Sequence, residues 1–292
     1  MSGFSTDWLR QREPFDTAAR DRVLARKFAA VLKQRQQGAL RIIDLAAGSG
    51  ANFRVLAPLL DADQTWSLVD HDPALLKSQV TEIQNWASNA GWHCGIANTD
   101  IVVKTGTATW HVHPQQLDLA QALHAVDLSA CDAVTTTAFL DLVSAEWIDR
   151  FCDQLVRAQR PLLATLTVDG RRTWQPEQTL DEDIAAAFAR HQGGDKGFGY
   201  ALGAAATPYL AQRLAAAGYA VSSARSDWQV CTAHGAMLRR MAEETVAVAC
   251  ETEPSSTARY GEWLSLRTAQ IEAGTLSLTV GHLDLLALPP AR

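Results

Sequence analysis

The chain reads Ile42-Ile43-Asp44-Leu45-Ala46-Ala47-Gly48-Ser49-Gly50 at the point that decides its fold. The first half of this stretch is short, apolar and β-branched, which is typical of a buried parallel strand. The second half is a glycine-bearing turn, and residues 51–61 after it have the pattern of a helix. Glycines in a strand-to-helix turn let the backbone and the free amides of the helix approach a ligand closely. The stretch therefore predicts a βα unit with a ligand at its turn.

Strands and helices alternate on both sides of this turn. Residues 7–37 are expected to be helical, with Asp16 and Thr17 suited to cap a helix. Residues 65–70 are expected to form the second strand, before a helix that Pro73 opens at its first turn. Further strands are expected at 107–113, 131–139, 161–168, 219–229 and 276–288, and further helices at 144–159, 180–191, 208–217, 235–250 and 256–273. This order predicts an α/β fold with a mostly parallel sheet and helices on both faces.

Length and composition predict one domain over residues 1–292. Within it, residues 1–38 are expected to form an N-terminal helical cover, 171–207 a lid or substrate insertion, and 233–274 a helical elaboration. The net charge of -6 argues against a nucleic-acid partner. Five scattered cysteines, with no apolar segment suited to a signal peptide or a membrane span, predict a cytoplasmic protein. The oligomeric state stays open between monomer and homodimer.

Two other kinds of site fit the sequence less well. A dinucleotide-binding turn has the spacing G-x-G-x-x-G, but Phe53 stands at the third glycine position and opposes close helix–strand packing. Asp44 would also repel the phosphates of such a ligand. An NAD(P)-dependent oxidoreductase is therefore kept only as an alternative. His111 and His113 share one face of a strand, but no third ligand accompanies them at a metal-binding spacing, so no metal is expected.

The glycine turn resembles the first motif of the class I methyltransferases, the seven-strand, Rossmann-like enzymes that use S-adenosylmethionine. The resemblance continues at residues 68–73, where Asp70 ends the second strand, at Asp118-Leu119, and at residues 137–142, which resemble the fourth motif. It covers roughly residues 40–170 well and the final strands loosely. Ala46 departs from it, because the family usually has its first glycine at that position.

The resemblance implies a seven-stranded sheet with an antiparallel C-terminal strand. It also implies S-adenosyl-L-methionine as cofactor, S-adenosyl-L-homocysteine as product, and a small-molecule acceptor that is methylated by in-line displacement. The cofactor-binding residues that it implies are Asp44, Ala46, Gly48, Gly50, Asp70, His71, Asp118, Leu119 and Thr137. In the family, the acidic residue after the second strand binds the ribose hydroxyls and the one after the third meets the adenine amine. Taken alone, Asp70 is also suited to cap a helix, and an aspartate such as Asp118 is more often a surface residue or a cap than a ligand contact.

An in-line methyl transfer mainly requires alignment of the reactants. Asp141 is the leading candidate to orient or deprotonate the acceptor, and capping of the next helix is an equal alternative. The glycine-rich segment 191–200 is expected to be a lid that carries His191 as a base, with a plain surface loop as the alternative. The expected substrate-binding residues are Asp195, Lys196, Phe198 and Tyr200 in this segment and Arg12, which like Arg20 is suited to bind a carboxylate.

The segment 191–200 resembles one found in a poorly defined bacterial methyltransferase subgroup, and this resemblance names no substrate. A non-catalytic regulatory protein that binds S-adenosylmethionine or S-adenosylhomocysteine is the remaining alternative.

Overall fold

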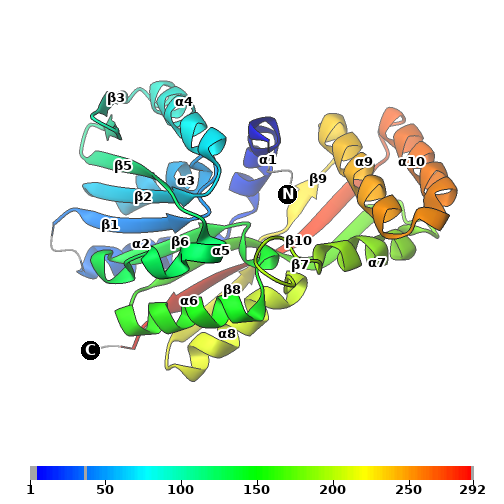
Figure 1. The fold of residues 1–292 in the computed structure, drawn as a ribbon. Coiled ribbons are helices and arrows are strands. Elements are labelled where there is room, and N and C mark those ends of the chain that lie inside the picture. Colours follow the sequence, from blue (N-terminus) through cyan, green and yellow to red (C-terminus); the bar gives the residue numbers. More distant parts are fainter. Residues whose placement is uncertain (1–4, 36–37, 291–292) are drawn as a thin grey trace.

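Ten strands form one sheet at the centre of the computed structural model, which describes residues 5–35 and 38–290 (Figure 1). The strands are β1 Leu40–Leu45, β2 Gln64–Asp70, β3 His93–Ala97, β4 Asp100–Lys104, β5 Thr109–Gln116, β6 Ala133–Thr137, β7 Leu162–Gln175, β8 Ala220–Arg225, β9 Trp228–Val230 and β10 Ser277–Leu288. The α-helices are α1 Thr6–Ala19, α2 Arg22–Arg35, α3 Ala51–Leu60, α4 Pro73–Asn89, α5 Leu119–Ala122, α6 Ala145–Ala158, α7 Asp181–Gln192, α8 Ala206–Ala216, α9 Gly235–Thr252 and α10 Thr257–Glu272. Among the short 3-10 helices, η3 Leu140–Leu142 bears on the site.

The strand order across the sheet is β3-β4-β5-β2-β1-β6-β7-β10-β8, and β9 also pairs with β10. From β5 to β7 all neighbours are parallel, whereas β10 runs antiparallel between β7 and β8. The predicted Rossmann-like sheet of seven strands is therefore confirmed as β5-β2-β1-β6-β7-β10-β8, including its antiparallel C-terminal strand. The strand order reverses between β1 and β6, and ligands of open α/β sheets bind outside the carboxyl ends of strands at such a point.

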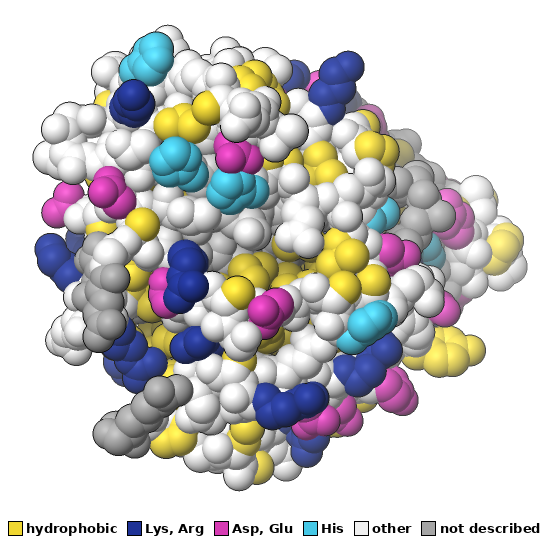
Figure 2. Space-filling view, turned by 60° about the vertical axis from the view of Figure 1, so that its left-hand side comes forward, with side chains coloured by type: hydrophobic (Ala, Val, Ile, Leu, Met, Phe, Trp, Pro, Cys, Tyr) yellow, Lys and Arg dark blue, Asp and Glu magenta, His cyan; other side chains and the backbone are white. Residues whose placement is uncertain are grey.

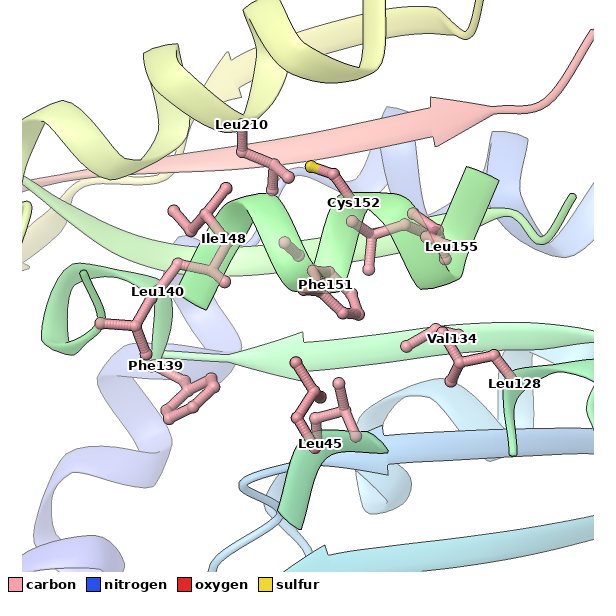
Figure 3. Close-up of a cluster of buried hydrophobic side chains, with 14 of the residues drawn as sticks. Leu45, Leu128, Val134, Phe139, Leu140, Ile148, Phe151, Cys152, Leu155 and Leu210 are labelled. Carbon is pink, nitrogen blue, oxygen red and sulfur yellow. The ribbon is translucent and has the colours of Figure 1, made fainter. Parts of the chain in front are cut away.

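Helices cover both faces of the sheet. On one face α2, α3 and α4 pack over a cluster that includes Phe53. On the other face α5, α6 and α8 pack over a second cluster, in which Phe151 of α6 and Leu210 of α8 gather with Leu45 and Val134 of the sheet (Figure 3). Burial of side chains of this size stabilises a fold by about 1.5–3 kcal/mol each. The two layers thus fix the carboxyl ends of β1 and β6 from both sides.

The strands β7 and β10 are the longest, with 14 and 12 residues, and they extend past the other strands. The helices α7, α9 and α10 surround this extension (Figure 1) and enclose a third apolar cluster that includes Trp174 and Trp263. The helix α1 reaches the same cluster through Trp8 and Phe15. It therefore connects the extension with the turn after β1, over which its Leu9 lies.

The N-terminal segment forms two helices where the sequence suggested one. The helix α1 ends at Ala19, and the side chain of Asp21 accepts a hydrogen bond from the Leu24 amide at 2.7 Å at the start of α2. Asp16, which the sequence suggested as a helix cap, is instead buried. The cover predicted for residues 1–38 includes residues 1–4 and 36–37, which lie outside the described residues.

The surface carries charges of both signs. Figure 2 shows Lys and Arg side chains interspersed with Asp and Glu on one face of the molecule. Across the described ranges, no helix combines the length and the apolar character that crossing a bilayer requires.

Candidate cofactor site at the carboxyl ends of the strands

The turn after β1 is held against β2 and α4. The Gly48 amide donates to Oδ2 of Asp70 at 2.8 Å, and the side-chain amide of Gln79 donates to the Gly48 carbonyl at 2.8 Å. Ala46 has a φ of 54° and Gly48 has the same value. Ala46, at the position where the resembled motif has glycine, thus adopts the left-handed conformation that glycine favours. Ala46 therefore differs from the motif in its side chain, whereas its backbone has the conformation that glycine favours.

Asp70 faces this turn and does not cap the next helix. Its Oδ1 accepts from the Asp72 amide at 3.0 Å, and Asp72 is the residue that caps α4, through the Ala74 amide at 2.8 Å. Asp70 is buried, whereas the neighbouring His71 is mostly exposed, 3.5 Å from the carboxylate. An ionised carboxylate has about four acceptor positions. Asp70 therefore keeps acceptor capacity beside the glycine turn.

Asp44 lies fully buried at the end of β1. Its Oδ1 accepts from Nδ2 of Asn52 at 2.6 Å and from the Thr135 hydroxyl at 2.7 Å, while its Oδ2 has no partner. Burial raises the pKa of Asp44 to about 6, against the hydrogen bonds from Thr135 and Asn52 and the charge of Arg20, which lower it. An unpartnered buried carboxylate oxygen is costly unless a ligand supplies a donor.

Arg20, just after α1, reaches the same edge of the sheet. Its Nη1 donates to Oδ1 of Asn52 and to the Thr165 hydroxyl, both at 2.7 Å, and its Nη2 donates to the Thr137 hydroxyl at 3.1 Å. Its Nε has no partner. Burial lowers the pKa of Arg20, and the more distant charges of Asp16, Asp284 and Asp44 partly oppose this shift. Thr137, predicted to contact the cofactor, is thus joined to Asp44 through Arg20 and Asn52.

The predicted adenine contacts lie at the start of α5. Asp118 is exposed and caps this short helix, with its Oδ1 accepting from the Ala120 amide at 2.8 Å. Leu119 is buried, and its carbonyl accepts from the Trp147 indole at 2.8 Å. The backbone amide of Leu117 donates to the Asp70 carbonyl at 2.9 Å, so this segment adjoins the end of β2.

Asp141 lies in η3, after β6, and the residue is 7% exposed. It does not cap the next helix, since Ser144 caps α6 through the Trp147 amide at 3.3 Å. Burial raises the pKa of Asp141 to about 6, and the charge of Arg12 lowers it. Its Oδ1 has no partner. The alternative of a cap is thereby wrong, and Asp141 is a buried carboxyl with one unpartnered oxygen.

The segment predicted as a lid is only partly free. Phe198 packs on Phe139 and Trp147, with ring centroids 5.3 and 6.1 Å away. Tyr200, in contrast, is 82% exposed. The Phe198 side chain thus anchors the segment in the apolar layer over β6, beside η3.

The polar residues of this segment contact one another and α9. Oδ1 of Asp195 accepts from the amides of Gly197 and Gly199 at 2.7 and 3.0 Å, which shapes the loop. His191 lies 3.4 Å from the Lys196 ammonium and 3.5 Å from a carboxylate oxygen of Glu251 in α9. The contact with Lys196 is partly buried, and neither contact joins His191 to Asp141.

Arg12 is engaged on α1 itself. Its guanidinium forms a bidentate ion pair with Asp16 at 2.9 and 3.2 Å and lies 5.1 Å from the ring of Trp228. The Trp228 indole also donates to Asp16 at 3.0 Å. A substrate carboxylate would have to compete with Asp16 for this arginine.

Sequence reasoning missed several members of this network. The residues that hydrogen-bond to Asp44 or Arg20 were not predicted: Asn52, Thr135 and Thr165. Nor was His282 on β10, which lies in the same region as Arg12. Burial lowers the pKa of His282 to about 4. The available signal was the run of threonines at 135–137, because hydroxyls in an otherwise apolar buried strand need partners. In the described part of the chain, no three His, Cys, Asp or Glu side chains gather as a metal site would require.

The comparisons with known proteins find similar structures but no match to a sequence family or a curated protein. No family model and no curated protein matches the chain. A Thiobacillus denitrificans S-adenosylmethionine-dependent methyltransferase in complex with S-adenosylhomocysteine aligns with a TM-score of 0.44 at 15% identity, over 99% of each chain. The corresponding Geobacter sulfurreducens complex has a TM-score of 0.43 at 14% identity, over 96% of this chain and 98% of that one. The Mycobacterium tuberculosis cyclopropane synthase MmaA2 has a TM-score of 0.42 at 11% identity, over 89% and 82%. These TM-scores are too low to assign a family, so the function is argued from the geometry of the chain.

Proposed function

We propose that the protein is a methyltransferase that uses S-adenosylmethionine and methylates a small-molecule acceptor. The observation that carries the proposal is the buried Asp44, whose Oδ2 lacks a partner beside a glycine turn that Asp70 contacts. S-adenosylmethionine carries an ammonium group, a sulfonium and a ribose with two hydroxyls, and it has no phosphate. Asp44 would accept a hydrogen bond from the ammonium, and Asp70 would accept from the ribose hydroxyls.

The strongest competing function is dinucleotide-dependent oxidoreduction. Phe53 occupies the position where the dinucleotide motif has its third glycine, and its side chain is fully buried against Trp66, Trp86 and Trp110. The buried Phe53 therefore favours a nucleoside without a pyrophosphate.

Asp141 is the proposed proton acceptor. When bound, the cofactor supplies a methyl group that is already activated for displacement from sulfur. Oδ1 of Asp141, which has no partner, would take the proton that the acceptor loses when it is methylated. Because burial raises the pKa of Asp141 to about 6, the carboxyl is ionised above that pH. The rate of methyl transfer is therefore expected to rise as pH passes through about 6 and then to level off.

Calorimetric titration with S-adenosylhomocysteine and with NADH tests the function. We expect saturable binding of S-adenosylhomocysteine, and NADH binding at least ~100-fold weaker, since a pyrophosphate would meet the Asp44 and Asp70 carboxylates. Replacement of Asp70 by Asn should raise the Kd of S-adenosylhomocysteine about 10-fold or more, because charge-assisted hydrogen bonds to the ribose are lost. Asp127→Asn, at an exposed position, is the matched control.

Tighter binding of NADH than of S-adenosylhomocysteine would overturn the proposal. Tight binding without release of S-adenosylhomocysteine from S-adenosylmethionine, across a broad set of small acceptors, would favour the regulatory alternative.

A further inference from the structure

Arg20 differs from the other buried arginines of the described chain. Arg54 and Arg267 are also buried, and each pairs with a carboxylate, that of Glu13 and that of Asp181. The three hydrogen-bond acceptors of Arg20, in contrast, are the neutral side chains of Asn52, Thr137 and Thr165. Burial of a cation is costly unless an anion and full hydrogen bonding compensate.

The free hydrogens of Arg20 form a fork. A guanidinium has five N–H donors. Nη1 uses both of its hydrogens, on Asn52 and Thr165, and Nη2 uses one, on Thr137. Nε, which has no partner, and one Nη2 hydrogen remain. Arg54 and Arg12 bind the carboxylates of Glu13 and Asp16 through Nε and Nη2. Arg20 therefore has hydrogens available on Nε and Nη2, the two nitrogens through which Arg12 and Arg54 bind carboxylates.

The position of Arg20 defines which carboxylate fits. Asn52 lies between the two charges, since its Nδ2 donates to Asp44 and its Oδ1 accepts from Arg20. One side-chain amide therefore separates the carboxylate of Asp44 from the guanidinium of Arg20. Each of these two groups also has an unpartnered atom, Oδ2 in Asp44 and Nε in Arg20. An anionic and a cationic group at this spacing complement the ammonium and carboxylate of one α-amino acid.

We infer that Arg20 binds the α-carboxylate of the cofactor's amino-acid end, opposite Asp44, so that the two side chains select a zwitterion. This inference rests on the proposed function and deepens it. It assigns α1 a direct part in the cofactor site, because Arg20 immediately follows that helix. A nucleoside thioether that lacks the carboxylate should then bind weakly.

Titration calorimetry with two ligands tests the inference: S-adenosylhomocysteine and its decarboxylated analogue, 5′-deoxy-5′-(3-aminopropylthio)adenosine. We expect the wild-type protein to bind S-adenosylhomocysteine at least ~10-fold more tightly, since a bidentate arginine–carboxylate pair is lost with the analogue. Arg20→Gln should raise the Kd of S-adenosylhomocysteine by a similar factor and leave that of the analogue within about 3-fold, so that discrimination disappears. Arg22→Gln, at an exposed position near Arg20 in sequence, should change neither Kd.

The outcomes separate the two proposals. If wild-type protein binds neither ligand, the proposed function is wrong. If it binds both equally well, or if Arg20→Gln weakens both by the same factor, Arg20 is structural and this inference alone is wrong. The wild-type comparison requires no variant, so it decides the matter even if Arg20→Gln does not fold. Where the variant folds, as judged by circular dichroism, loss of discrimination supports the inference.

Discussion

At the residue scale, Ala46 has a backbone conformation that alanine rarely adopts, with φ at 54°. The left-handed region costs a non-glycine residue about 1–2 kcal/mol, while glycine costs about 0.5–1 kcal/mol through the unfolded chain. Ala46→Gly is therefore expected to change the free energy of unfolding by less than about 1 kcal/mol. A measurable change should be an increase, so that the variant is the more stable protein. Ala46→Val should destabilise the protein by about 2 kcal/mol or more, because β-branching worsens the strain. Urea denaturation measures both, and a loss of stability in Ala46→Gly as large as that in Ala46→Val would contradict the interpretation.

The buried carboxyl of Asp141 predicts a pH dependence of stability. Its pKa, raised by burial to about 6, exceeds that of an unfolded aspartate, so the folded state keeps the proton to a higher pH. The stabilising contribution of the protonated form is complete below about pH 4 and is lost as pH rises to about 6. Relative to Asp141→Asn, wild-type protein should lose of the order of 2–3 kcal/mol of unfolding free energy between pH 4 and pH 8. An unchanged difference between the two proteins across this range would contradict a raised pKa, and the exposed Asp153→Asn is the control.

Single residues were predictable from the sequence where a motif fixed their place on a strand. Asp44, Gly48 and Asp70 follow directly from the two strand ends, and the structure brings them together. Their roles toward a cofactor stay predictions. The expectation of Asp16 as a helix cap is wrong, because this residue lies inside α1, which Ser5 caps. Its ion pair with Arg12 joins residues one helical turn apart, but its burial depends on Trp228, far away in the sequence.

At the scale of elements, one ion pair fastens α1 to the start of α3. Arg54, buried in α3, binds Glu13 of α1 at 3.0 and 2.6 Å and also the Ser49 carbonyl. Glu13→Gln leaves this arginine without its anion and should lower the free energy of unfolding by about 1–3 kcal/mol, less than for a fully buried pair because Glu13 is partly exposed. Hydrogen exchange in α1 should accelerate.

Asp7→Asn is the matched control on the same helix, since the Asp7–Arg10 pair is exposed and should contribute under ~1 kcal/mol. Equal effects of the two substitutions on the exchange of α1 would show that the Glu13–Arg54 pair does not hold this helix.

Elements were predictable where burial leaves a strong pattern. The parallel strands β1, β2 and β6 are apolar because helices cover both their faces. The hairpin of β3 and β4 escaped prediction, because β3 is an exposed edge strand with no apolar alternation and its turn holds Asn98-Thr99 in place of the common Asn-Gly. The break between α1 and α2 was also not predicted from the sequence.

At the scale of the whole molecule, we predict that the sheet and its extension unfold together, as a single domain. The strands β7 and β10 pass through both regions without interruption by a linker. Leu278→Ala, in the apolar cluster of the extension, should lower the free energy of unfolding by about 2–5 kcal/mol through the cavity it leaves. The loss of stability should extend to the apolar cluster under α5, α6 and α8, where Cys131 and Cys152 are buried.

Thiol labelling of these cysteines and tryptophan fluorescence, followed in the same urea series, provide the measurement. Coincident transitions that shift equally in Leu278→Ala are expected for one cooperative unit. A cysteine transition that keeps its midpoint in the variant would indicate two independent units.

The position of β10 bears on how the protein is synthesised. This strand is the last of the ten to leave the ribosome, yet it inserts between β7 and β8, which do not pair with each other. Until it arrives, β7 presents an unpaired edge and β8 has no partner, a state that favours association with other chains. Nascent protein is thus expected to depend on chaperones until β10 has been synthesised, and a stop codon ahead of residue 277 should give an aggregating product even though the glycine turn after β1 is intact.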